Sequence, residues 1–191
     1  MYRLPASIAY RLEYAFCQQE LDDMLGCKSH MAQLGGVGAV LALDWLQARL
    51  CQRAFVLSMH SLREPWLSSQ PALPPAQRAP LNAASPGAAF SQAGAQDLLQ
   101  QLGCHSGMLL RLDGDTRSHQ LCIVRQSDSW LMFDPDSGEY RADSLAGCAQ
   151  WLHDLCQLRQ AWRGGCLSVD APLIFRAPGQ AYAAPRFAAQ Y

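Results

Sequence analysis

Charged residues are scarce in this 191-residue chain. Lys and Arg together number 15 and Asp and Glu number 16, so charged side chains make up 16% of the sequence and the formal net charge is -1. No stretch gathers basic residues into a run, which argues against nucleic acid as the main partner, because binding to a phosphate backbone depends on clustered positive charge. Hydrophobic residues make up 50%, which excludes a disordered chain and predicts one globular domain over residues 1–191.

Long hydrophobic runs are absent as well. No apolar stretch approaches the roughly 18 to 20 residues that a membrane-spanning helix requires. The N-terminal segment from Met1 to Tyr14 carries Arg3, Arg11 and Glu13 in place of an uninterrupted apolar core before a cleavage site. We therefore expect no membrane span and no cleaved signal peptide.

Clustered metal ligands are missing too. None of the eight cysteines belongs to a C-x-x-C pair, and the histidine closest to a cysteine is His105, beside Cys104. Asp113-Gly114-Asp115 resembles the start of a calcium loop but lacks the later ligands and the closing glutamate. The sequence predicts no metal and no cofactor. It also predicts mostly reduced, buried cysteines, because a chain of this length can bury a core without disulfides.

Two segments in the first third of the chain are predicted to be helical. Apolar residues recur at helical spacing from Ile8 to Leu25. The stretch that starts at Gly38 is apolar on nearly every face, which is typical of a helix in the middle of a domain, and its pattern extends as far as Met59. Six of the eleven prolines follow between residues 65 and 86, so residues 65–95 are interpreted as a Pro-rich loop or insertion within the single domain.

The second half of the chain changes to a strand pattern. After a short helix predicted from Gln96 to Leu102 and closed by Gly103, apolar residues alternate with a period of two in three segments bounded by Gly, Asp or Ser. Helical spacing returns from Leu145 to Leu158, and a last strand is predicted from Leu167 to Phe175. Helices followed by an antiparallel sheet indicate an α+β domain. The three alternating segments are Met108–Leu112, His119–Val124 and Trp130–Phe133.

A histidine and an aspartate on neighbouring predicted strands are the candidate chemical site. A turn around Ser127 and Asp128 is predicted to place His119 opposite Asp134. Cross-strand neighbours on one face lie about 4.5 to 5.5 Å apart at Cβ, close enough for a carboxylate to orient an imidazole. The alternative is a partly buried histidine whose ring nitrogens are satisfied by local polar groups.

Three stretches together resemble a known family: Gly36 to Leu46, His119 to Val124, and Trp130 to Tyr140. They are similar to the nucleophile helix, the His strand and the Phe-Asp-Pro-Asn-x-Gly-Glu-Phe segment of the YopT and AvrPphB family of cysteine protease effectors. In that family a Gly-x-Cys sequence is followed by Leu three residues and Trp seven residues after the cysteine. Leu41 and Trp45 fit that spacing around position 38.

The resemblance implies a papain-like fold, in which a central helix from about Gly38 packs against an antiparallel sheet that presents His119 and Asp134. By position, His119 would be the general base, Asp134 the carboxylate that orients it, and Gln33 the oxyanion-hole residue. Bacteriocin-processing peptidase domains, also papain-like, share the His and Asp-Pro spacing. Gly38 stands where the family has its nucleophilic cysteine, and glycine has no side chain to attack a carbonyl.

The glycine at position 38 leaves three explanations open: a natural pseudoenzyme, an engineered Cys-to-Gly substitution in an active protease, or a displaced nucleophile. The first functional hypothesis is a YopT-like cysteine protease that is inactive as written. The alternatives are a non-catalytic peptide- or protein-binding module or adaptor, and a papain-like glutamine deamidase or acyl transferase toxin. The resemblance also implies export from the bacterial cytoplasm by a specialised secretion system into a host cell, with a host protein or a secretion chaperone as partner.

Overall fold

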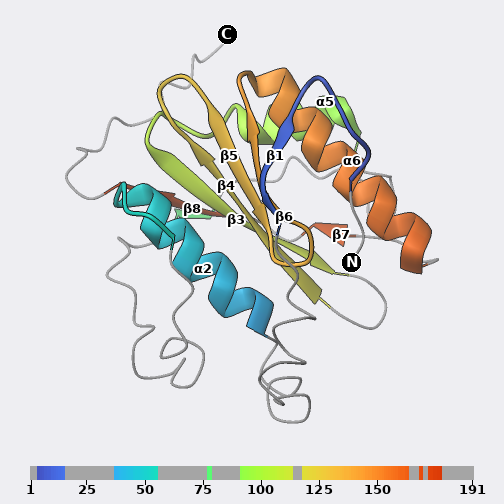
Figure 1. The fold of residues 1–191 in the computed structure, drawn as a ribbon, viewed down its shortest axis with the longest axis horizontal. Coiled ribbons are helices and arrows are strands. Elements are labelled where there is room, and N and C mark those ends of the chain that lie inside the picture. The colour runs from blue at the N-terminus through green and yellow to red at the C-terminus, as the bar shows by residue number, and fades with distance from the viewer. Residues whose placement is uncertain are drawn as a thin grey trace, which may run out of the picture.

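The computed structural model describes residues 4–15, 37–55, 77–78, 91–113, 118–163, 168–169 and 172–177. These residues form an eight-stranded antiparallel sheet and three helices (Figure 1), so the predicted α+β class is confirmed. The strands are β1 (Arg11–Ala15), β2 (Gln77–Arg78), β3 (Ser106–Asp113), β4 (Ser118–Arg125), β5 (Trp130–Asp134), β6 (Gly138–Ala142), β7 (Ser168–Val169) and β8 (Leu173–Arg176). Their order in the sheet is β1-β6-β5-β4-β3-β8-β2, and β7 pairs with part of β3. No helix in this part of the chain is both long and apolar enough to cross a membrane.

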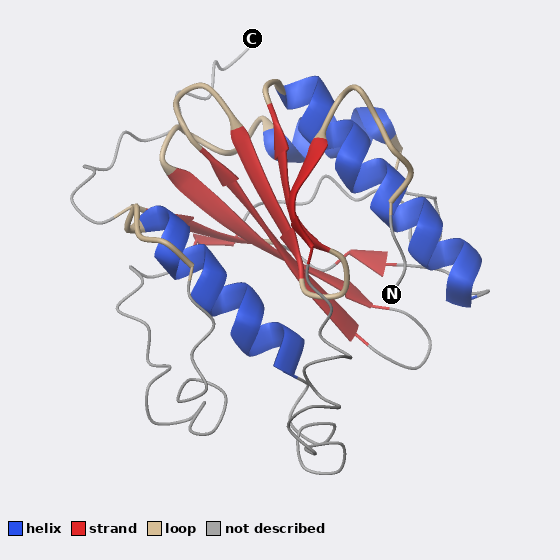
Figure 2. Ribbon diagram, viewed as in Figure 1, coloured by secondary structure: helices blue, strands red, loops and turns tan. Residues whose placement is uncertain are grey.

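The sheet separates two hydrophobic layers. Figure 2 shows α2 (Val37–Leu50) on one side of the sheet and α5 (Gln92–Leu99) with α6 (Leu145–Arg163) on the other. Alternate residues of β4 belong to different layers: Cys122 and Val124 pack with α2, whereas Leu121 and Ile123 pack with α5 and α6. This alternation decides which helix each side chain of the sheet can reach.

The central helix α2 is held by aromatic packing. Its Trp45 is fully buried and stacks on Phe133 of β5, with ring centroids 5.3 Å apart. The helix ends at Leu50, where Gln52 adopts a left-handed conformation with φ 54 and Arg53 N donates to Ala48 O at 2.8 Å. The prediction that the helix extends to Met59 is therefore wrong for residues 51–55, and residues 56–59 lie outside the described part of the chain.

Most predicted elements of the second half are present. The three alternating segments form β3, β4 and β5, and the predicted helix at Leu145 extends to Arg163. The short helix α5 begins earlier than expected, because the Ser91 side chain caps it by accepting a hydrogen bond from Gly94 N, and it ends before Gly103. Within the last predicted strand the structure describes β7 and β8, which both pair with β3. Of the Pro-rich 65–95 segment, only 77–78 and 91–95 are described.

The prediction of an N-terminal helix is wrong for the described residues up to Ala15. Arg11–Ala15, expected within a helix, is strand β1, which pairs antiparallel with β6 at one edge of the sheet. Tyr10 anchors this edge, since its hydroxyl donates to Asp154 of α6 at 2.9 Å and its ring lies in the core beside α6. Helical spacing over a few residues is a weak preference, and pairing with β6 overrides it. Residues 16–25 lie outside the described residues.

Candidate functional site

His119 and Asp134 meet in the structure, although the predicted register is wrong. Strands β4 and β5 pair with Cys122 opposite Phe133, so Asp134 lies level with Leu121 and not with His119. The two side chains share one face of the sheet and meet diagonally, with His119 Nε2 2.6 Å from Asp134 Oδ1. His119 is 8% exposed and Asp134 is completely buried.

An arginine that the sequence analysis did not identify completes this cluster. Arg159 of α6 is 3% exposed, and its Nη2 lies 2.6 Å from His119 Nε2 and 2.9 Å from Asp134 Oδ1. The same nitrogen donates to Asp136 Oδ2 at 3.0 Å. Arg159 lies seven residues, about two helical turns, after the buried Leu152 and therefore on the same apolar face of α6. The sequence signal that could have identified Arg159 is a charged residue at a core-facing position of a helix, because such a residue is almost never buried without a partner.

The carboxylate of Asp134 is the electrostatic centre of the cluster. Burial by itself would raise its pKa, but the positive charge of Arg159 and then the interaction with His119 hold the pKa well below its ordinary value. Ser137 contributes in the same direction, since its hydroxyl donates to Asp134 Oδ2 at 2.6 Å. Asp134 therefore stays ionised in the core.

Both ring nitrogens of His119 face charged neighbours. Nε2 lies against Asp134 and Arg159, and Nδ1 lies 3.7 Å from Asp136 Oδ2. A general base needs a ring nitrogen directed at the proton that it takes. In this arrangement the neighbours of both nitrogens come from β5, the turn after it, and α6.

Position 38, where the resemblance predicts the nucleophile, belongs to the layer on the α2 side of the sheet. Gly38 is buried in the first turn of α2, and α2 packs on Cys122, Phe133 and the other side chains of the face opposite α6. His119 shares the α6 face with Leu121. The structure thus brings together His119 and Asp134 but places them on the face of the sheet away from α2. The sequence predicts that the central helix packs against a sheet that presents His119 and Asp134; in the structure, α2 and this pair lie on opposite faces of that sheet. Gln33 lies outside the described residues.

Glu139 connects α2 to the sheet on this second face. It is 7% exposed and accepts hydrogen bonds from Trp45 Nε1 at 2.8 Å and from Arg49 Nη2 at 2.6 and 2.7 Å. The Glu of the Asp-Pro-x-x-Gly-Glu segment therefore anchors the central helix through a partly buried ion pair.

Three of the five cysteines that the structure describes are buried and are poor candidates for a nucleophile. Burial raises the pKa of the Cys122 and Cys148 thiols, and it raises that of Cys156 to about 12 despite the nearby charge of Arg159. Cys104 is exposed, Cys51 is half-buried, and these five described cysteines are unpaired. Three of these five are buried, and the reduced state of the thiols stays a prediction. The other three cysteines, at positions 17, 27 and 166, lie outside the described residues.

The same cluster contains a potential set of metal ligands. Ligand atoms of His119, Asp134 and Asp136 lie within 4.8 Å of one another. Arg159 Nη2 lies within 3.0 Å of an atom of each of the three. A guanidinium group thus already supplies the positive charge among these ligands, and a divalent ion would have to displace it.

Comparisons with known proteins found only distant similarity, and only to solved structures. No family model matches the chain, and a search of curated proteins found no match. Among solved structures, the chain is similar to the Pseudomonas avirulence protein AvrPphB, with 16% sequence identity and a TM-score of 0.37. The similarity covers 46% of this chain and 48% of that chain, so it extends over about half of either protein.

Proposed function

We propose that this chain is a non-catalytic protein- or peptide-binding domain built on a cysteine-protease-like α+β scaffold. The observation that carries the proposal is the placement of Gly38 and His119 with different layers of the fold. Gly38 lies in the first turn of the helix on one face of the sheet, while His119 is held on the opposite face by Arg159 of α6. A thiol hydrolase requires a thiolate and an imidazole within hydrogen-bond reach of each other.

Two further features support a binding role over thiol catalysis. Glycine at position 38 carries no group that can attack a carbonyl. The His119 imidazole is nearly enclosed by Asp134 and Arg159, so the pair acts as a buried connection between the sheet and α6. The motif resemblance to a family of bacterial effectors supports an extension of the proposal to delivery into a host cell, with a host protein or secretion chaperone as the partner.

The test is thiol reactivity at position 38. In Gly38→Cys, alkylation at mildly acid pH is measured by mass spectrometry, with the exposed Cys104 as the reference thiol in the same sample. The first turn of α2 lowers the pKa of any cysteine placed there, so the informative quantity is the dependence on His119. We expect the same alkylation rate at position 38 with and without His119→Ala. A rate that falls at least tenfold with His119→Ala would overturn the proposal.

The second candidate is a cysteine protease, deamidase or acyl transferase whose nucleophile lies elsewhere in the chain. The 2.6 Å contact between His119 and Asp134 favours it, because a buried carboxylate is the usual partner of a catalytic imidazole. The same experiment on the unsubstituted protein separates the candidates. Catalysis requires one native cysteine that is alkylated rapidly at acid pH only when His119 is present, whereas the binding domain has none.

A further inference from the structure

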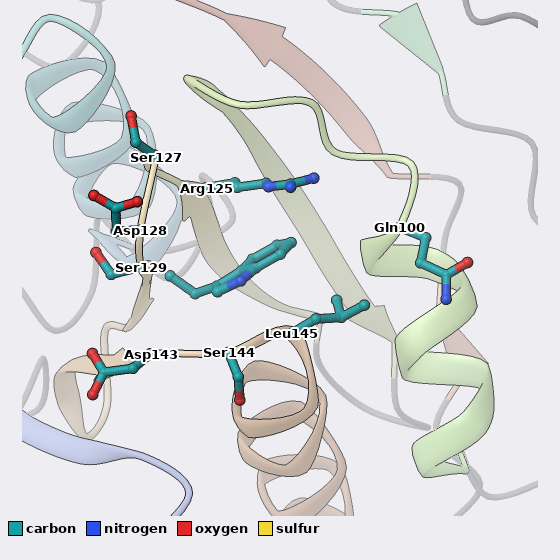
Figure 3. Close-up of a pocket in the computed structure, with 9 residues that line it drawn as sticks. Gln100, Arg125, Ser127, Asp128, Ser129, Asp143, Ser144 and Leu145 are labelled. Carbon is teal, nitrogen blue, oxygen red and sulfur yellow. The ribbon is translucent and has the colours of Figure 1, made fainter.

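A small polar cavity lies at the end of the sheet opposite to His119 and Asp134. His119 lies near the start of β4 and Arg125 at its end, so the two are roughly 20 Å apart along the strand. The cavity has a volume of about 290 Å³, and Figure 3 shows the residues around it, which come from the β4–β5 turn, the start of α6 and the end of α5. Liquid water occupies about 30 Å³ per molecule, so the space suits a ligand of roughly ten non-hydrogen atoms or fewer. Its lining residues are Gln100, Arg125, Ser127, Asp128, Ser129, Trp130, Asp143, Ser144 and Leu145.

A fixed guanidinium group lines this cavity. The Arg125 guanidinium lies over the Trp130 ring, 5.3 Å from its centroid, and Nη1 donates to Leu102 O at 2.7 Å. These two contacts hold the group in place while engaging one of its five N–H donors. A held arginine binds a carboxylate with little loss of side-chain entropy.

A buried indole N–H is the second indication of a ligand. Trp130 is 6% exposed and lines the cavity, and its N–H makes no hydrogen bond within the described residues. A buried tryptophan usually finds an acceptor for this proton, as Trp45 does with Glu139. The N–H of Trp151 is fully buried, whereas that of Trp130 keeps access to open space.

The start of α6 adds positive potential at the same place. Ser144 and Leu145 line the cavity, and Leu145 is the first residue of this 19-residue helix, which has no acidic side chain in its first turn. The Ser144 hydroxyl accepts from Gly147 N at 3.0 Å, which leaves the other first-turn amides for an external acceptor. Arg125, Trp130 and the helix end together favour an anionic group.

Two carboxylates stand on the exposed rim of the cavity. Asp143 is shared with Arg11 at 3.5 Å and Arg141 at 3.8 Å, whereas Asp128, in the β4–β5 turn, has no ion pair within the described residues. A dianion such as phosphate would be repelled by these rim carboxylates. A ligand with both a carboxylate and an ammonium group would match the Arg125 side of the cavity and the negative rim. We propose that the cavity binds a free α-amino acid, with its carboxylate toward Arg125 and the Trp130 N–H and its ammonium group toward Asp128.

Three small probes test this assignment by NMR on the ¹⁵N-labelled full chain, whose five tryptophans provide separate indole signals. L-alanine is expected to shift the Trp130 indole signal with an affinity in the millimolar range. L-alaninamide, which lacks the carboxylate, and N-acetyl-L-alanine, which lacks the ammonium group, are each expected to bind about tenfold more weakly. Equal binding of L-alaninamide or of N-acetyl-L-alanine would overturn the proposal, as would the absence of any shift with L-alanine.

Matched variants locate the binding site. Trp130→Phe keeps an aromatic ring under Arg125 but removes the N–H, and Arg125→Gln removes the charge; each is expected to weaken L-alanine binding about tenfold. Trp151→Phe also removes an unpaired indole N–H, but in the core away from the cavity, and Arg53→Gln removes an exposed charge outside it. Binding by both controls should equal that of the parent chain. Unchanged binding in Trp130→Phe and Arg125→Gln would overturn the assignment, and so would an equal loss in the controls.

Discussion

Replacing Arg159 with methionine should destabilise the protein strongly at neutral pH. The substitution keeps the approximate length of the side chain but leaves Asp134, which is completely buried, without its principal counter-charge. Removing one partner of a buried ion pair costs about 3 to 5 kcal/mol, because the remaining charge is both desolvated and unpaired. We expect a loss of about this size in the free energy of unfolding, measured by urea denaturation at pH 7.5.

The pH dependence identifies Asp134 as the cause. In the parent chain the pKa of Asp134 is lower when folded than when unfolded, so its contribution to stability is present above the unfolded value of about 4 and is lost as the pH falls below it. Without Arg159, burial raises the folded pKa of Asp134 above the unfolded value, and protonation then relieves the unpaired charge. The difference between parent and variant should therefore shrink as the pH falls from 7.5 toward 4.

A double variant and a surface control complete this test. Arg159→Met combined with Asp134→Asn removes both charges and should be more stable at pH 7.5 than Arg159→Met alone. Arg53→Met, at an exposed position, should change the unfolding free energy by less than about 0.5 kcal/mol. A loss below about 1 kcal/mol in Arg159→Met, or a loss that does not change with pH, would refute the assignment of a buried ionic connection.

Three other substitutions test contacts elsewhere in the fold. Glu139→Gln removes the charged acceptor of Arg49 and should lower the unfolding free energy by about 1.5 to 3 kcal/mol in urea denaturation; a loss below about 0.5 kcal/mol would contradict its role as an anchor. Gly107→Ala puts a Cβ into a side chain of α2 and should cost about 1 to 3 kcal/mol, whereas the control Gly103→Ala has room; equal melting temperatures would contradict this packing. Burial, and then Asp154, raise the pKa of Tyr10, so an ultraviolet titration should show one tyrosine that ionises above pH 10 and is missing in Tyr10→Phe. The corresponding stability should be lost only as the pH rises above about 10, and a normal titration of all tyrosines would contradict the contact.

The sequence by itself determined the elements whose patterns are long and consistent. Strands β3, β4 and β5 alternate with a period of two, and α6 has a sustained helical period, so their existence follows from local side-chain order. Because α2 is apolar on nearly every face, the sequence also predicted that this helix is buried, and its Trp45 is completely buried. Local patterns failed at β1 and β6, because their residues become strands through pairing with each other and with β5.

Only the tertiary structure decided how the chemical groups meet. Alternation along β4 already implied that His119 shares a face with Leu121, but α2 is apolar on nearly every side, and no local pattern states which face of the sheet it covers. The shift in register between β4 and β5, and the placement of Arg159 between His119 and Asp134, depend on how the turn and α6 pack, which involves residues up to 40 positions apart. Sequence spacing therefore identified the histidine and the aspartate, while long-range packing determined that they face α6 and lie away from Gly38.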